Sequence, residues 1–176
     1  MKSQAETAGH LTNSIGTHPQ RGTVLRDLEL TMIDGGRSLL SSLRGSNSLV
    51  IIFTAGRDLH ALLADLAKKT SALKEHNARV LVISTSREQP ASEVRPFGET
   101  FLIAFDDNRQ VHRALGATDA AQSPLPSIYI TDRFGEVFAA FQSTDPQSLS
   151  NPGEIIRWLE FIEQQCEECS PPEWPE

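Results

Sequence analysis

The sequence predicts an α/β domain whose mixed central sheet is covered by helices on both faces. Residues 49–54, LVIIFT, and residues 79–85, RVLVIST, are continuous apolar runs typical of central strands buried on both sides. The segment between them has apolar residues at helical spacing, which indicates a strand–helix–strand unit with parallel strands. The leucines that give this spacing are Leu59, Leu62, Leu63, Leu66 and Leu73.

Turn and capping residues delimit the other elements. Asp34–Gly36 predicts a hairpin turn near the start of the chain, and Arg133–Gly135 predicts a second hairpin turn between two short strands. A strand and a short helix that closes at Gly116 lie between these hairpins. A last helix opens at Asn151, which is a good N-cap, and has Pro152 in its first position.

The totals describe one soluble globular domain with tails. At 176 residues the chain can bury one sizeable core, and its net charge of −7 argues against nucleic acid as a partner. No apolar run approaches the ~20 residues that span a membrane, and the start of the chain has no secretory signal. Two cysteines are too few for a disulfide framework, so we expect a cytoplasmic protein. The expected parts are a flexible N-terminal tail (residues 1–22), the domain (residues 23–163) and a C-terminal Cys-x-x-Cys tail (residues 164–176).

Four segments, in this order, resemble the alkyl hydroperoxide reductase/thiol-specific antioxidant family, the peroxiredoxins and redoxins of the thioredoxin-like superfamily. They are LELTMIDGGRSLLSSLRG, LVIIFT with its leucine-spaced helix, FLIAFDDNRQVHRALGA and PLPSIYITDRFGEV. The resemblance covers residues 23–163 and implies a thioredoxin-like three-layer sandwich with an N-terminal β-hairpin. It also implies antioxidant or oxidoreductase chemistry, and a cis-proline at Pro126 facing the active site. The alternative for Pro126 is an ordinary trans proline that opens a strand.

The position where this family carries its reactive cysteine holds no thiol. By the resemblance, that cysteine stands where the helix begins, a place where the helix dipole lowers a thiol pKa. Gly56, Arg57 and Asp58 occupy this position, and Thr54 lies too early and has no paired base. Asp58 is either a capping carboxylate or, with Thr54, Arg57 and Pro126, part of a ligand pocket. We therefore expect a degenerate active site in a non-catalytic binding or regulatory module, with a protein partner at the groove near Pro126.

Cys166 and Cys169 form a Cys-x-x-Cys with three interpretations. As a redox pair they would give a thiol-disulfide oxidoreductase or antioxidant protein, although Glu167 and Glu168 between them disfavour thiolates. As metal ligands they supply half of a tetrahedral zinc site. A homodimer could complete the site by bringing two tails together, or a neighbouring histidine could contribute a ligand. In the third interpretation they are two reduced cysteines, or an incidental disulfide, on a tail packed by Trp174.

Overall fold

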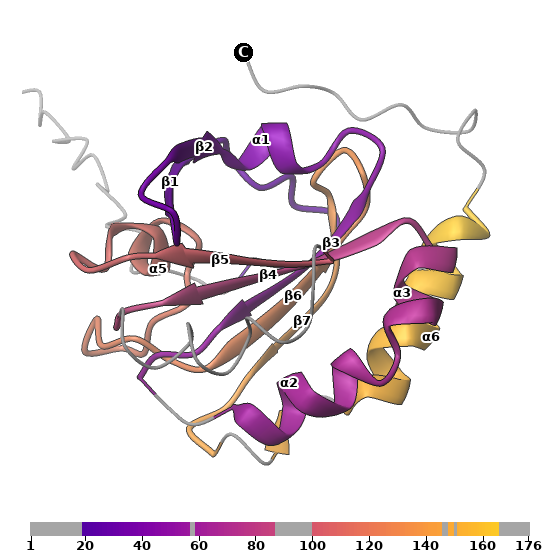
Figure 1. Ribbon diagram of the computed structural model, residues 1–176. Helices are drawn as coiled ribbons and strands as arrows, with labels where there is room; N and C mark the ends of the chain where they lie inside the picture. The colour runs from indigo at the N-terminus through magenta and orange to yellow at the C-terminus, as the bar shows by residue number, and fades with distance from the viewer. Residues whose placement is uncertain (1–18, 57–58, 87–99, 146–147, 150, 166–176) are drawn as a thin grey trace, which may run out of the picture.

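A seven-stranded mixed sheet forms the centre of the molecule (Figure 1). The computed structural model describes residues 19–56, 59–86, 100–145, 148–149 and 151–165. Over these residues the strand order is β2-β1-β5-β4-β3-β6-β7. The strands are β1 (Glu29–Met32), β2 (Arg37–Leu39), β3 (Ser48–Phe53), β4 (Ala78–Ser84), β5 (Phe101–Phe105), β6 (Ser127–Thr131) and β7 (Val137–Gln142).

The middle of the sheet is parallel and its flanks are antiparallel. β4 runs parallel to both β3 and β5, whereas β6 pairs antiparallel with β3 and β7, and β1 pairs antiparallel with β5. Both predicted hairpins are present, β1–β2 and β6–β7. Every residue of β3 is buried, as its continuous apolar sequence predicts for a strand covered on both faces.

Helices cover both faces of the sheet, so the predicted three-layer sandwich is confirmed. In Figure 1, α2, α3 and α6 lie on one side of the sheet, and α1 and α5 lie on the other with the β1–β2 hairpin. The described helices are α1 (Leu40–Leu43), α2 (His60–Ala67), α3 (Thr70–Glu75), α5 (Gln110–Ala114) and α6 (Pro152–Glu163).

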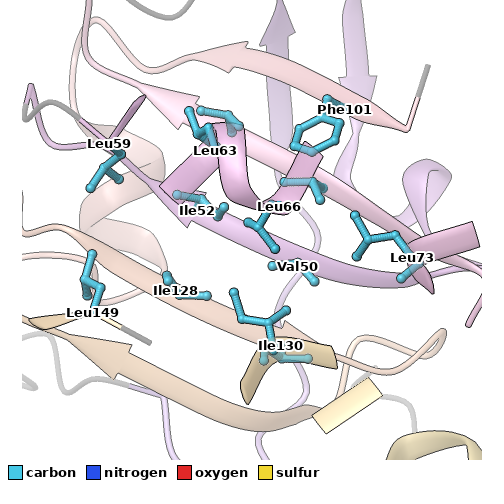
Figure 2. Close-up of a cluster of buried hydrophobic side chains, with 14 of the residues drawn as sticks. Val50, Ile52, Leu59, Leu63, Leu66, Leu73, Phe101, Ile128, Ile130 and Leu149 are labelled. Atoms are coloured by element: carbon cyan, nitrogen blue, oxygen red, sulfur yellow. The ribbon is translucent and has the colours of Figure 1, made fainter. Parts of the chain in front are cut away.

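Each face of the sheet has its own apolar core. Val50 and Ile52 of β3 point into the first core, where Figure 2 shows them with Leu63 and Leu66 of α2. The alternate residues of β3 point into the second core, which α1 and α5 help to fill. They are Leu49, Ile51 and Phe53.

The helical segment after β3 is divided in two, whereas its leucine spacing predicts one helix. α2 ends at Ala67 and α3 begins at Thr70, with a turn at Lys68 and Lys69. The hydroxyl of Thr70 donates to the carbonyl oxygen of Ala67 at 2.6 Å, a back-bond of the kind that bends helices. α3 then stops before Asn77, whose φ of 46° lies in the left-handed region that often ends helices.

The described chain begins along the edge of β7. The amide of Gly22 donates to the carbonyl of Val137, and the amide of Val137 donates back to the carbonyl of Thr23. Arg21 lies over the rings of Phe138, Trp158 and Phe161, at 5.2–5.9 Å from their centroids. Contacts with the domain therefore begin before residue 23, where the sequence places its boundary, while residues 1–18 lie outside the described part.

Candidate functional site

The carboxyl ends of β3, β4 and β5 meet the start of β6 at one edge of the sheet. Phe53, the last residue of β3, is paired with Ser127, the first residue of β6. Thr54 and Pro126, one step further along each strand, therefore flank the same edge. In sheets with parallel strands this edge is where ligands usually bind. It is the place where the sequence predicts the pocket.

Thr54 uses its hydroxyl within the fold. The side chain is buried, and its Oγ1 donates to Oγ of Ser84 at 3.3 Å. Ser84 Oγ in turn donates to the carbonyl of Ser86 at 2.9 Å and accepts from the amide of Ser86 at 3.1 Å. None of these partners is a general base, so Thr54 is a buried link between β3 and β4 rather than a nucleophile.

The turn after Thr54 is shaped by two left-handed residues. Ala55 has a φ of 51° and the exposed Gly56 has a φ of 71°. A Cβ atom at Gly56 would have only Thr85 Oγ1 near it, at 3.8 Å, so the restriction there comes from the backbone and not from crowding. Arg57 and Asp58 lie outside the described residues.

Leu59 is the N-cap of α2, so Asp58 does not occupy that position. Among the residues that the structure describes, no side chain makes a capping hydrogen bond there. Leu59 is buried in the first core, and Figure 2 shows its side chain directed to the same cluster as Leu63. Apolar packing therefore contributes to the start of α2. Asp58 comes just before this N-cap and lies outside the described residues, so the role of its side chain stays a prediction.

Pro126 is buried and follows a trans peptide bond, so the cis-proline implied by the resemblance is wrong. No cis peptide bond occurs within the described ranges. The segment before Pro126 runs in extended form beside residues 117–118, because the amide of Leu125 donates to the carbonyl of Ala117 and Thr118 bridges to Pro124.

Asp106 and His112 form a buried pair at the same edge, which the sequence analysis missed. His112 Nδ1 lies 2.7 Å from Asp106 Oδ2, and the amide of His112 donates to the same oxygen at 2.7 Å. Both side chains are almost fully buried, at 0% and 2% exposure. Asp106 directly follows β5 and lies six positions before His112, so its position after a strand was the signal available in the sequence.

Hydrogen bonds and burial act in opposite directions on Asp106. Burial favours the neutral acid, but hydrogen bonds from His112 and Val111 stabilise the carboxylate, and together they lower the pKa of Asp106 below its ordinary value of 3.8. The carboxylate is therefore charged at neutral pH and acts as an acceptor for the imidazole. Nε2 of His112 is buried without a hydrogen-bond partner among the described residues.

Aromatic rings connect this pair with β6. The ring of Phe53 lies 5.0 Å from the ring of His112, edge to face, and 5.3 Å from the ring of Tyr129. The Tyr129 hydroxyl accepts a hydrogen bond from Nε2 of Gln142 at 2.9 Å, and burial raises the pKa of Tyr129 above its ordinary range. Tyr129 is therefore a neutral, fixed side chain and not an acid or base in the physiological range.

A groove of about 760 Å³ lies outside Asp106, between the β1–β2 hairpin and α5. It is lined by three arginines from three segments, Arg26, Arg37 and Arg113, together with acidic residues. Arg37 pairs with Glu29 at 2.9 Å on the exposed surface. The charges of the groove are thus mixed, and no single class of ligand follows from them.

Cys166 and Cys169 lie outside the described residues, but the helix that precedes them is placed. α6 ends at Glu163, where Oε2 accepts a hydrogen bond from Nδ1 of His76 at 2.8 Å. His76 follows α3 and stands just before β4, so this contact lies at the opposite end of the sheet from Thr54 and Pro126 (Figure 1).

The described part of the chain lacks both a metal-ligating cluster and a membrane-spanning helix. No group of three histidine, cysteine, aspartate or glutamate side chains there is close enough to hold a metal ion. None of its helices has the length and apolar character required to cross a bilayer.

The sheet order, the leading hairpin and the helices on both faces define a thioredoxin-like protein of the peroxiredoxin type. A sequence model of the AhpC/TSA family matches residues 22–140. The chain belongs to this family. No curated protein sequence matches it.

Solved structures agree on the fold. Thiol peroxidase from Chromobacterium violaceum superposes with a TM-score of 0.64 at 19% identity, covering 85% of this chain and 91% of that chain. AhpC from Mycobacterium tuberculosis gives 0.67 at 15% identity, covering 88% and 97%. The thioredoxin domain of a thiol-disulfide oxidoreductase from Bacteroides vulgatus gives 0.61 at 16% identity, covering 82% and 98%. At these identities the likeness is one of fold alone.

Proposed function

We propose that this chain is an AhpC/TSA family member with a degenerate active site, which works as a non-catalytic binding or regulatory module. The observation that carries the proposal is the chemistry of the turn after β3. Thr54 is buried and hydrogen bonded to Ser84, and Gly56 has no side chain. The chain has two cysteines, Cys166 and Cys169, and neither is near this turn in sequence.

Reduction of a peroxide by a single residue needs a thiolate, because the thiolate attacks the peroxide oxygen and is itself oxidised to sulfenic acid. A threonine hydroxyl cannot replace it, and a carboxylate such as Asp58 has no comparable oxidation chemistry. We therefore infer that the edge near Pro126 retains a binding surface, and we propose a protein partner for it. A cytoplasmic location and a homodimer belong to the same proposal.

Covalent reach argues against a tail cysteine acting at this edge of the same chain. Gln165 is the last described residue, and Cys169 is four residues further, at most about 14 Å of extended chain. The seven residues of β4 alone separate the two ends of the sheet by about 20 Å. This limited reach supports the proposal that neither thiol acts at the Thr54–Pro126 edge of its own chain while α6 stays packed on the domain.

The alternative function is a thiol-disulfide oxidoreductase or antioxidant protein that uses Cys166 and Cys169 on a separate substrate. The spacing of the two residues favours it, since a Cys-x-x-Cys can attack and then resolve a mixed disulfide. Glu167, Glu168 and the negative end of the α6 dipole oppose it, since all of them raise thiol pKa values.

A peroxide-consumption assay and an insulin-reduction assay separate the two functions. The reduced full-length protein, supplied with dithiothreitol, should turn over neither substrate above the rate of the buffer, while an active peroxiredoxin assayed in parallel consumes peroxide. Activity that disappears in Cys166→Ser and in Cys169→Ser would establish the alternative. Peroxidase activity that persists in a variant carrying both Cys166→Ser and Cys169→Ser would contradict both functions.

A further inference from the structure

Three aromatic rings from β7 and α6 gather around one cation on the surface of the domain. The ring of Phe161 lies 6.3 Å from that of Phe138 and 5.8 Å from that of Trp158, edge to face in both pairs. All three side chains are half-buried, so part of each ring remains accessible. The guanidinium carbon of Arg21 lies 5.2–5.9 Å from the three ring centroids. Because an aromatic face attracts a cation, the three rings together form a site that selects positive charge.

The chain supplies the cation of this site through residues 19–24, which we call the N-terminal strap. The amide of Gly22 donates to the carbonyl of Val137, and the amide of Val137 donates to the carbonyl of Thr23. An isolated bridge continues this antiparallel pairing one residue further. The strap therefore covers the edge of β7 in the way that an added strand does when a peptide binds to a sheet, with Arg21 as its side-chain anchor.

The strap is held more weakly than the strands beside it. Residues 20–23 are exposed, whereas Pro19 is buried. Within the described residues, two backbone hydrogen bonds join the strap to β7. The next anchor is Leu25, whose amide donates to the carbonyl of Gly135 and whose side chain is buried in the second core. The strap can thus open as far as Leu25 while both apolar cores stay packed.

We propose that the aromatic site takes an arginine from a protein partner, whose extended segment replaces the strap along β7. The strap itself defines the chemistry of that segment: an arginine on the rings, followed by a backbone amide that reaches the carbonyl of Val137. The net charge of −7 favours the approach of such a basic segment. The strap is then an autoinhibitory contact, because the site is closed until the strap opens.

This site is separate from the binding surface proposed near Pro126. Val137 is paired with Thr131, the last residue of β6, whereas Pro126 precedes Ser127, the first residue of that strand. The two places therefore lie at opposite ends of β6. The aromatic site does not depend on the function proposed above.

A double variant, Arg21→Ala with Gly22→Pro, opens the strap and leaves the rings in place. The first change removes the cation. The second removes the amide that donates to Val137, and it cannot adopt the φ of 87° at this position, since proline holds φ near −65°. Arg26→Ala, at an exposed arginine beyond the strap, is the matched control.

A synthetic peptide with the sequence of residues 19–25, PQRGTVL, blocked at both ends, serves as the probe. Its binding is followed by the indole ¹H–¹⁵N resonance of Trp158, assigned with the help of Trp174→Phe. The peptide should bind the double variant at least about 10-fold more tightly than it binds the wild type or Arg26→Ala, because a closed strap reduces the competent fraction. A peptide with alanine in place of its arginine should bind about 5- to 30-fold more weakly.

Hydrogen exchange in the wild type tests the strap without any risk to folding. The amide of Val137 is protected by the carbonyl of Thr23, so its exchange reports the opening of the strap. It should exchange at least about 10-fold faster than the central amides of β3. Arg21→Ala should accelerate it by a further factor of about 2–5, and Arg26→Ala should leave it unchanged.

Three outcomes would overturn the proposal. Exchange at Val137 as slow as in β3 would make the strap a fixed part of the fold. Equal binding of the arginine and alanine peptides would show that the rings do not select the cation. A dimer of the double variant in light scattering, formed without peptide, would assign the edge of β7 to a second copy of the chain.

Discussion

Asp106 and His112 show how single polar residues are accommodated inside this fold. The carboxylate accepts two hydrogen bonds from His112, one from the ring and one from the backbone amide, and it accepts a further backbone bond from Val111. These bonds offset the cost of removing a charge from water. The pair therefore joins the carboxyl end of β5 to α5, on the face of the sheet where Phe53 packs.

Replacement of Asp106 by Asn should destabilise the protein by about 1–3 kcal/mol, because a weaker acceptor then faces two buried donors of His112. Asp107→Asn, the same change at the exposed neighbour, should stay within about 0.5 kcal/mol. Urea denaturation at pH 7 measures both. Equal effects of the two substitutions would contradict a structural role for the buried pair.

The same variant makes a prediction about pH. The folded-state pKa of Asp106 lies below its ordinary value of 3.8, so its stabilising contribution is present above that value and is lost as the pH falls through the folded pKa. The difference in unfolding free energy between wild type and Asp106→Asn should therefore be constant from pH 7 to about pH 5 and shrink below about pH 4. Denaturation curves at a series of pH values measure it.

The pKa of a second aspartate, Asp132, is shifted in the opposite direction to that of Asp106. Burial raises the pKa of Asp132 above its ordinary 3.8, although backbone amides of the β6–β7 turn donate to it. The amides of Phe134 and Glu136 both reach its Oδ1. A raised folded-state pKa means that the contribution of Asp132 to the unfolding free energy declines as the pH rises through that value. Asp106 and Asp132 therefore change the stability of the protein in opposite directions as the pH falls.

Among the helices, α6 has the most complete start. Asn151 Oδ1 accepts from the amide of Glu154 at 3.0 Å, and Pro152 occupies the first turn, where its missing N–H costs nothing. The buried side of the helix is formed by Ile155, Ile156 and Leu159. The capping residues and the apolar spacing thus both predict a helix that begins after Asn151.

Asn151→Ala should lower the unfolding free energy by about 1 kcal/mol, because the amide of Glu154 loses its side-chain acceptor. Asn151→Asp keeps an acceptor and adds a favourable charge at the helix start, so it should match or exceed the wild type. Chemical denaturation compares the three proteins. A loss in the Asp variant as large as that in the Ala variant would contradict the capping role.

Local sequence signals predicted most of these elements correctly. The apolar runs of β3 and β4, the Asp34–Gly36 turn and the cap at Asn151 each specify their structure through a few neighbouring residues. The break between α2 and α3 was missed because the leucine spacing continues across it, and the side-chain bond of Thr70 has no periodicity of its own.

The candidate site was less predictable because its contacts are long-range or depend on backbone geometry. The edge formed by Thr54 and Pro126 was expected, but the peptide bond before Pro126 is trans, whereas the family resemblance implied a cis bond. The contact between His76 and Glu163 joins residues that are 87 positions apart, and no local sequence pattern predicts it.

The segment that precedes β1 packs against the β6–β7 turn and contributes to the second core. The amide of Leu25 donates to the carbonyl of Gly135, and Arg44 donates to the carbonyl of Phe134 at 2.8 Å, so this segment and α1 both attach to the β6–β7 turn. Leu25 itself is buried in the second core at 4% exposure. The second core therefore depends on residues that are distant in sequence from the central strands.

Leu25→Ala should cost about 2–5 kcal/mol, because it removes buried methyl groups and leaves a cavity in the second core. Leu39→Ala makes the same chemical change at a side chain that is 49% exposed, and it should stay within about 0.5 kcal/mol. Thermal and urea unfolding measure the pair. Similar small effects at both positions would mean that the segment before β1 contributes little to the second core.

The separation between the Thr54–Pro126 edge and the His76–Glu163 contact has a mechanical consequence. The buried strands of the sheet separate the two places by about 20 Å. Double variants with one change at each place should therefore have additive effects on the unfolding free energy.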